Sequence, residues 1–146
     1  MESFTVEAKT ENWDEVLSFL EAFLEKEECS MKAQTQISIA LEEMFVNVAH
    51  YAYNDTDVPA DERIARVDLE VLKDEAASGG RKVKITLTDG GIPYDPLAKE
   101  DPDVTLSAED RQIGGLGIFM VKKSMDSVHY EYRDGKNIFT MEKAIA

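Results

Sequence analysis

Residues 37–53, ISIALEEMFVNVAHYAY, decide how this chain can fold. Apolar residues recur there at helical spacing, and with Ser30 as the N-cap the pattern predicts one helix that runs to about Tyr53. The only acidic residues in the stretch are Glu42 and Glu43, and it contains no lysine or arginine. A helix without a charged outer face is typical of one packed on several sides. We therefore expect this helix to be sandwiched between other elements.

Shorter patterns on both sides of this helix predict the remaining elements. Alternating apolar residues predict strands at 3–9, 63–73, 83–89, 128–132 and 138–145, and helical spacing predicts further helices at 13–27 and 116–126. Strands and helices do not alternate strictly along the chain, which argues against a doubly wound parallel sheet. We expect an α+β fold, a two-layer α/β sandwich in which helices cover one face of a mixed, mostly antiparallel sheet.

The composition restricts the class of protein. A length of 146 residues fits one hydrophobic core, so we expect a single domain over 1–146. One cysteine cannot form an intrachain disulfide, no apolar run approaches the roughly 20 residues that cross a bilayer, and the N-terminus lacks a signal-peptide pattern. These features predict a cytoplasmic protein. The net charge of −14 argues against direct nucleic-acid or membrane binding, but it is compatible with a small anionic ligand or a basic protein partner.

Glu43 and Asn47 form the first candidate site. They lie four residues apart and therefore share one face of the predicted helix. A carboxylate and an amide on an otherwise apolar helix need partners, because burying them unpaired costs several kcal/mol. One interpretation is that the two side chains bond to each other or meet solvent at the helix edge. The other interpretation is a functional site.

The segment 89–93, DGGIP, is the second candidate site and follows directly on a predicted strand. Gly91 and Pro93 set a bend there, and a carboxylate beside glycine can approach a flat ligand closely. The ionised carboxylate of Asp89 only accepts hydrogen bonds, so it suits an exocyclic amine. An ordinary Asp-Gly turn is the alternative.

The third candidate is Gly114-Gly115-Leu116-Gly117, at the start of the predicted helix 116–126. Glycines at a helix N-terminus let backbone N–H groups approach a phosphate, and the helix dipole favours the negative charge. No Walker-type Gly-Lys-Ser follows. The preceding stretch, 95–113, lacks periodicity and contains a single arginine, Arg111. A long aperiodic stretch of this kind is typical of a functional lid or of disorder.

The three candidate sites together resemble a known superfamily. ALEEMFVNVAHYAY (40–53), LTDGGIPYDP (87–96) and GGLGIFMVKKSMDSVHYEYRDGKNIFTMEK (114–143) look like the N, G1 and G2 boxes of the GHKL (Bergerat-fold) ATPases. Within that superfamily the chain is similar, over nearly its whole length, to the stand-alone bacterial serine/threonine kinases that act as anti-sigma factors. The resemblance implies the histidine-kinase-like ATPase fold, with ATP and Mg²⁺ as its ligands.

The resemblance also implies a role for each matched residue. Glu43 would be the general base for a seryl or threonyl hydroxyl, and Asn47 would coordinate Mg²⁺ on the ATP phosphates. Asp89 would bind the adenine amino group, with Gly91 shaping that pocket. Further nucleotide contacts would come from the backbone at Gly115, Leu116 and Gly117, from a lid at 95–113, and from Arg111 in that lid. The Gly-Thr pair that the family carries before its last strand is not plainly present, so Asn137 or Thr140 would stand in for it.

The implied function is that of an ATP- and Mg²⁺-dependent protein kinase which acts as an anti-sigma switch. It would phosphorylate an anti-anti-sigma antagonist protein and, in one partner state, sequester a sigma factor. Members of this family often form homodimers, so a homodimer is an expected form of this chain too. Two alternatives remain at this point: a nucleotide-binding module that switches partners without phosphate transfer, and a purely structural interaction domain.

Overall fold

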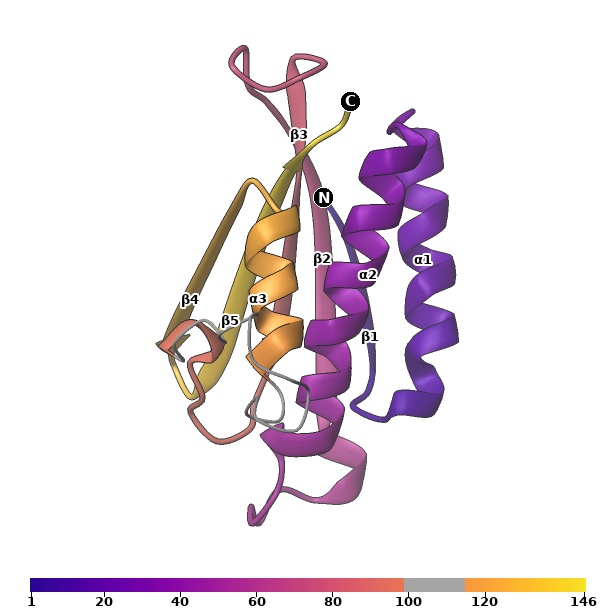
Figure 1. Ribbon diagram of the computed structural model, residues 1–146. Helices are drawn as coiled ribbons and strands as arrows, with labels where there is room; N and C mark the ends of the chain where they lie inside the picture. Colours follow the sequence, from indigo (N-terminus) through magenta and orange to yellow (C-terminus); the bar gives the residue numbers. More distant parts are fainter. Residues whose placement is uncertain (99–114) are drawn as a thin grey trace.

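A five-stranded sheet forms one layer of the molecule (Figure 1). The computed structural model describes residues 1–98 and 115–146. The strands are β1 (Glu2–Glu7), β2 (Ile64–Lys73), β3 (Arg81–Asp89), β4 (Ser127–Arg133) and β5 (Lys136–Ala144). Their order across the sheet is β1-β2-β3-β5-β4, and all neighbouring pairs among these strands are antiparallel.

Strand β3 lies at the centre of the sheet and ends at the second candidate site. Its alternate residues Val83, Ile85 and Leu87 are buried, and Asp89 continues this buried series at the end of the strand. Asp89 pairs in register with Asn137 of β5. The sheet therefore brings together two polar residues that are 48 positions apart in sequence.

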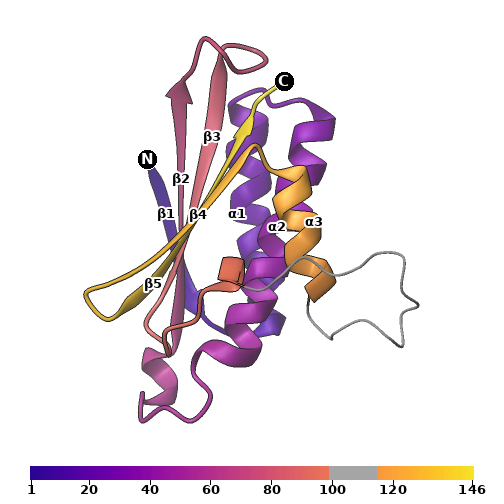
Figure 2. The ribbon, with the colours of Figure 1, turned by 60° about the vertical axis from the view of Figure 1, so that its left-hand side comes forward.

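The described helices cover one face of this sheet (Figures 1 and 2). They are α1 (Trp13–Lys26), α2 (Met31–Asn47) and α3 (Gly115–Ser124). Short helical turns lie before α1 at η1 (Thr10–Asn12), after α2 at η2 (Val48–Ala52), before β2 at η3 (Ala60–Glu62) and after β3 at η4 (Pro96–Ala98). Helix α2 lies between α1 and α3 and above the sheet. The expectation that this helix is packed on several sides is confirmed.

Both ends of α2 follow from its sequence. The Ser30 side chain accepts a hydrogen bond from the backbone N–H of Ala33 (3.1 Å), which confirms it as the N-cap. At the other end the helix widens into the π-helical turn η2, so that the helical path continues to Ala52, close to the predicted end. Such widened turns are frequent at functional sites.

The core lies between the helical layer and the sheet. Its largest fully buried side chains include Leu20, Leu24, Ile37, Leu41 and Phe45 from the helices and Val67, Leu69, Val83, Ile85 and Met141 from the strands. This arrangement confirms the predicted α+β, two-layer fold with helices on one face of an antiparallel sheet.

Candidate functional site

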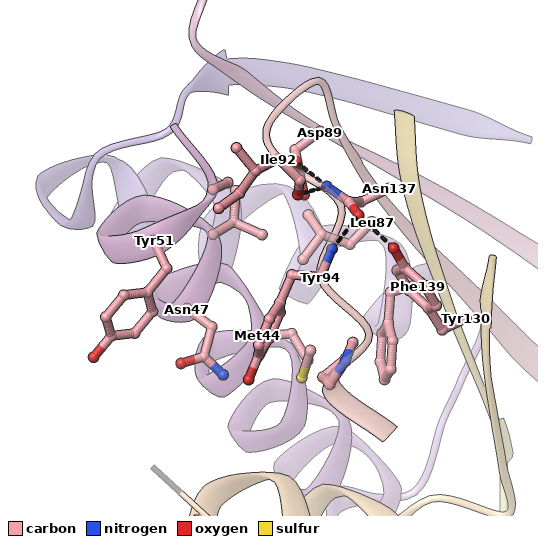
Figure 3. Close-up of a pocket in the computed structure, with 13 residues that line it drawn as sticks. Met44, Asn47, Tyr51, Leu87, Asp89, Ile92, Tyr94, Tyr130, Asn137 and Phe139 are labelled. Atoms are coloured by element: carbon pink, nitrogen blue, oxygen red, sulfur yellow. Dashed lines mark hydrogen bonds between the residues drawn. The ribbon is translucent and has the colours of Figure 1, made fainter. Parts of the chain in front are cut away.

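A pocket opens between the C-terminal end of α2 and the ends of β3, β4 and β5 (Figure 3). Its empty space is about 540 Å³, counting the part open to solvent. Apolar and aromatic side chains form most of its lining: Met44, Val48, Tyr51, Ala52, Leu87, Ile92, Tyr94, Pro96, Tyr130 and Phe139. The polar side chains are those of Asn47, Asp89 and Asn137. A mostly apolar pocket with a few fixed polar groups suits a flat ligand that must be held in one orientation.

Asp89 is the acidic group of this pocket and is only 6% exposed. Its Oδ1 accepts hydrogen bonds from the Gly91 backbone N–H and from the Asn137 side chain, both at 2.9 Å. Its Oδ2 receives no hydrogen bond from the described residues, so it remains able to accept one from a ligand. Burial raises the pKa of this carboxyl above its ordinary value of 3.8, and the bonds from Asn137 and Gly91 partly oppose the rise.

Asn137 connects several groups that line the pocket through hydrogen bonds. Its Nδ2 donates to Asp89 Oδ1 (2.9 Å) and to the Ile92 carbonyl (2.8 Å). Its Oδ1 accepts from the Tyr94 backbone N–H (3.1 Å) and from the Tyr130 hydroxyl (2.5 Å), as Figure 3 shows. An amide offers two donors and two lone pairs, so this side chain is fully used.

The structure thus distinguishes the two residues that were expected to replace the missing Gly-Thr pair. Asn137 lines the pocket, whereas Thr140 does not. The reason is the alternation of β5: Asn137, Phe139 and Met141 are buried on the face toward the helices, and Thr140 points to the other face. The same alternation was visible in the sequence and could have selected Asn137.

Gly91 lies against the end of α2 and permits a close contact there. A Cβ atom at this position would lie only 2.0 Å from the carbonyl oxygen of Ala52. The same carbonyl accepts a hydrogen bond from the backbone N–H of Ile92 (2.8 Å). Gly91 therefore shapes the pocket indirectly, by letting the 89–93 turn dock on η2.

Tyr53 supports the 89–93 turn from behind. Its hydroxyl accepts from the Gly90 backbone N–H (2.9 Å) and donates to the Ile64 carbonyl (2.6 Å). Burial raises the pKa of this tyrosine, so the hydroxyl keeps the proton that it donates. The turn is thus held by Ala52 of η2, by Tyr53 and by Asn137 of β5 at once, which goes beyond an ordinary Asp-Gly turn.

Asn47 is the last residue of α2 before the turn η2 and faces the pocket (Figure 3). Its half-buried amide makes no side-chain hydrogen bond to any described residue, and so it does not pair with Glu43. Among the described residues, no group of three or more His, Cys, Asp or Glu side chains could hold a metal ion. Mg²⁺ seldom needs such a cage, because it keeps several waters and is held by one or two carboxylates together with substrate phosphates. Asn47 would add one amide oxygen to such a coordination sphere, with phosphates and waters supplying the rest.

Glu43 lies one turn earlier on α2 and does not line the Asp89 pocket. It lines a neighbouring groove between α2 and α3, together with Gly117. A Cβ at Gly117 would lie 1.8 Å from Glu43 Oε1, so the absence of a side chain there makes room for the carboxylate. The structure therefore brings Asn47 together with Asp89, and brings Glu43 together with the first turn of α3.

Helix α3 begins at Gly115, so Gly115, Leu116 and Gly117 form its first turn. The N–H groups of a first turn have no partners within the helix and are available to an anion. Gly114, Arg111 and the greater part of the expected lid, from residue 99 onward, lie outside the described residues.

The fold and the pocket define a class: two-layer α/β proteins that hold a ligand between the helical layer and the end of the central strand. Comparison with known families specifies it further. The model of the histidine kinase-like ATPase domain matches residues 6–143, and the chain belongs to that family. Membership implies that the chain uses ATP.

Individual relatives agree with this assignment. The chain is 24% identical over 127 residues to the serine/threonine-protein kinase BtrW of Bordetella bronchiseptica, an alignment that covers 87% of this chain and 82% of that protein. Among solved structures it resembles the RsbU and RsbW domains of Rv1364c from Mycobacterium tuberculosis, with a TM-score of 0.60, 12% identity and coverage of 99% of this chain but 33% of that longer one. It also resembles the SiaB–SiaC complex of Pseudomonas aeruginosa, with a TM-score of 0.57, 18% identity and coverage of 99% of this chain and 90% of that one. These two structures establish the shared fold.

No helix in residues 1–98 and 115–146 is both long and apolar enough to cross a bilayer.

Proposed function

We propose that this chain is an ATP- and Mg²⁺-dependent serine/threonine protein kinase that acts as an anti-sigma switch, with residues 1–146 forming one ATP-binding unit and 95–113 its lid. The observation that carries the proposal is the pocket that combines Asp89, with Oδ2 open to a ligand, and the unpartnered amide of Asn47. The similarity to a serine/threonine-protein kinase supports phosphate transfer to a protein hydroxyl.

Each residue would contribute a distinct interaction. Asp89 accepts a hydrogen bond from the adenine amino group, and the apolar lining packs on the ring. The first-turn N–H groups at Gly115, Leu116 and Gly117 contact the phosphates, and Asn47 holds Mg²⁺ through its amide oxygen. Bound Mg²⁺ neutralises charge on the phosphate oxygens. This arrangement lets a chain of net charge −14 bind a polyanion without basic side chains in the pocket lining.

Glu43 would serve as the general base. The acceptor hydroxyl oxygen forms a bond to the γ-phosphorus while the bond from that phosphorus to the β,γ-bridging oxygen breaks, and ADP leaves. The hydroxyl proton passes to the Glu43 carboxylate. A positioned base of this kind contributes about 10²- to 10⁴-fold to the rate.

The partners would be an anti-anti-sigma antagonist, as phosphate acceptor, and a sigma factor. The structural likeness to a structure that holds RsbU and RsbW domains, and to the complex of SiaB with SiaC, supports a partner-switching role.

The test uses γ-labelled ATP and the cognate anti-anti-sigma antagonist protein. Wild type should transfer label, Glu43→Ala should bind ATP but transfer at least 100-fold more slowly, and Asp89→Asn should bind ATP roughly 10- to 100-fold more weakly. Indistinguishable transfer by wild type and Glu43→Ala, or no transfer by either, would sink the kinase proposal.

A second candidate function rests on the position of Glu43. Because this carboxylate lines a different groove from Asp89, the chain could bind ATP and switch partners without transfer. In that case the chain should bind ATP, Asp89→Asn should weaken this binding, and the partner should stay unlabelled.

A further inference from the structure

The groove between α2 and α3 is a second hollow beside the nucleotide pocket. Its empty space is about 1140 Å³, counting the part open to solvent, and its lining includes Gln36, Ile39 and Glu43 from α2 and Gly117, Met120 and Val121 from α3. The two helices lie side by side in both views (Figures 1 and 2). Glu43 connects the groove to the nucleotide site, because Asn47 of the pocket follows one helical turn later.

Gln36 carries an unmet hydrogen-bonding group at this groove. Its Oε1 is buried and has no hydrogen-bond partner. Among the described residues, it is the one buried side-chain nitrogen or oxygen atom without a partner. Buried polar groups in folded proteins are almost always paired, so an orphan of this kind needs an explanation. The terminal amide of glutamine turns easily about its last side-chain bond. A small rotation would therefore present this oxygen to a donor in the groove.

The lining indicates what kind of ligand the groove would take. Ile39 is 61% exposed and Met120 is 54% exposed, so apolar side chains flank the groove without a cover among the described residues. The only charged side chain of the lining is the carboxylate of Glu43. A ligand with apolar groups and backbone donors fits this lining, and one with acidic groups is repelled.

We propose that this groove binds the extended segment of the partner protein that carries the phosphate-accepting serine or threonine, and that Gln36 is its positioning residue. The proposal rests on the kinase function proposed above. The acceptor hydroxyl lies at Glu43, apolar side chains of the segment contact Ile39 and Met120, and a backbone N–H donates to Gln36 Oε1.

The spacing along α2 makes this placement specific. Gln36 and Glu43 are seven residues apart, which corresponds to about 10 Å along a helix. An extended chain advances about 3.3 Å per residue. The N–H that meets Gln36 therefore belongs to a residue about three positions from the acceptor.

The experiment uses a synthetic pool of nine-residue peptides with serine or threonine at the central position, incubated with the full chain and γ-labelled ATP. Gln36→Leu removes the acceptor oxygen at similar volume. It should raise KM for the pool about threefold to tenfold, while kcat and ATP affinity stay unchanged. Gln34→Leu is the matched control, because Gln34 is also on α2 but bonds to the Cys29 carbonyl and does not line the groove. It should leave KM unchanged.

A second pair of variants tests the apolar contacts. Met120→Ala should weaken the preference of the kinase for apolar residues beside the acceptor. Met31→Ala should not, because Met31 is also an exposed methionine, at 75% against 54% for Met120, but lies on α2 outside the groove. Label transfer with the same KM and the same preference in all four variants would overturn the groove while the kinase function stands.

Peptide binding is measured separately from phosphate transfer. This measurement uses the same peptide pool with alanine in place of the central serine or threonine. Its addition should shift the methyl NMR signals of Met120 and leave those of Met31 in place. Shifts at Met120 without label transfer to the hydroxyl pool would overturn the acceptor role but keep a peptide site. The absence of both would overturn the groove, while label transfer to the antagonist protein decides the kinase function separately.

Discussion

At the scale of single residues, Asn137 and Asp89 determine the geometry of the nucleotide pocket. The Asn137 amide donates two hydrogen bonds to the 89–94 segment and accepts two, one from that segment and one from Tyr130. These bonds hold the buried Asp89 in one orientation and occupy its Oδ1, so Oδ2 is the oxygen left for a ligand. The binding of an exocyclic amine then depends on whether this carboxyl is ionised.

Nucleotide affinity should consequently depend on pH through Asp89. Burial raises the pKa of this carboxyl, so as pH falls the group is protonated earlier than an ordinary aspartate. ATP affinity measured by calorimetry should decrease as pH falls through that raised pKa. Asp89→Asn should lower ATP affinity roughly 10- to 100-fold and remove this pH dependence, because its Oδ1 keeps the two existing donors and its NH₂ meets the adenine amine.

The stability of the free protein should move in the opposite direction. A pKa that is raised in the folded state stabilises the fold below the unfolded pKa, and this contribution is lost as pH rises through the folded pKa. At neutral pH Asp89 is therefore a net cost to folding, and Asp89→Asn should melt no lower than wild type. A pH-independent ATP affinity in wild type, or a marked loss of stability in Asp89→Asn, would contradict this account.

At the scale of elements, the site depends on how closely the 89–93 turn docks on the end of α2. Gly91 touches the η2 backbone, and the adjacent Ile92 N–H bonds to the same Ala52 carbonyl. Gly117 plays a comparable part where α3 meets Glu43. In both places a glycine permits the contact of two elements, in addition to any contact with phosphate.

Gly91→Ala should therefore destabilise the protein. Its new methyl group would meet main-chain atoms of Ala52, which cannot rotate away, so we expect a loss of about 1–3 kcal/mol in the free energy of unfolding and weaker ATP binding. Gly90→Ala is the control, since its methyl would lie 3.7 Å from the nearest atom, the Tyr53 hydroxyl. Denaturant unfolding of both variants measures the difference, and equal midpoints would show that the close contact is unimportant.

At the scale of the whole molecule, the net charge of −14 is unevenly distributed. Exposed acidic side chains gather on α1 (Asp14, Glu15, Glu21 and Glu25) and on the connection after α2 (Asp55, Asp57, Asp61 and Glu62). The candidate pocket has one acidic group and no basic side chain in its lining. The acidic excess is therefore available for contacts outside the pocket, and it would attract a basic partner such as a sigma factor.

Partner affinity should accordingly fall with salt. Added ions screen exposed charges, so the dissociation constant of a complex with the proposed sigma-factor partner should rise about tenfold between roughly 0.05 and 0.5 M NaCl. The double variant Asp61→Asn, Glu62→Gln should reduce this dependence if the connection after α2 takes part. An affinity that does not change with salt would leave solubility as the role of the excess charge.

Much of the fold could be predicted because it depends on local spacing. The apolar pattern around Ile37 to Val48 predicts α2, Ser30 predicts its start, and the alternation of Val83, Ile85 and Leu87 predicts β3 with Asp89 at its end. Side chains repeat every 3.6 residues in a helix and every two in a strand, so these elements leave a periodic record in the sequence. Each family motif is also a short continuous stretch of sequence, so it could be matched directly.

The strand order and the contacts between distant residues were decided only by the tertiary structure. Asn137 meets Asp89, Gly91 meets Ala52, and Glu43 meets Gly117 across long stretches of chain. No periodic pattern records which distant surfaces come together, because that choice depends on how all the buried faces pack at once. The sequence by itself thus determined the α+β class and the candidate site residues. Packing in three dimensions decided that Asn137 rather than Thr140 completes the pocket, and that Glu43 lies in the groove beside it.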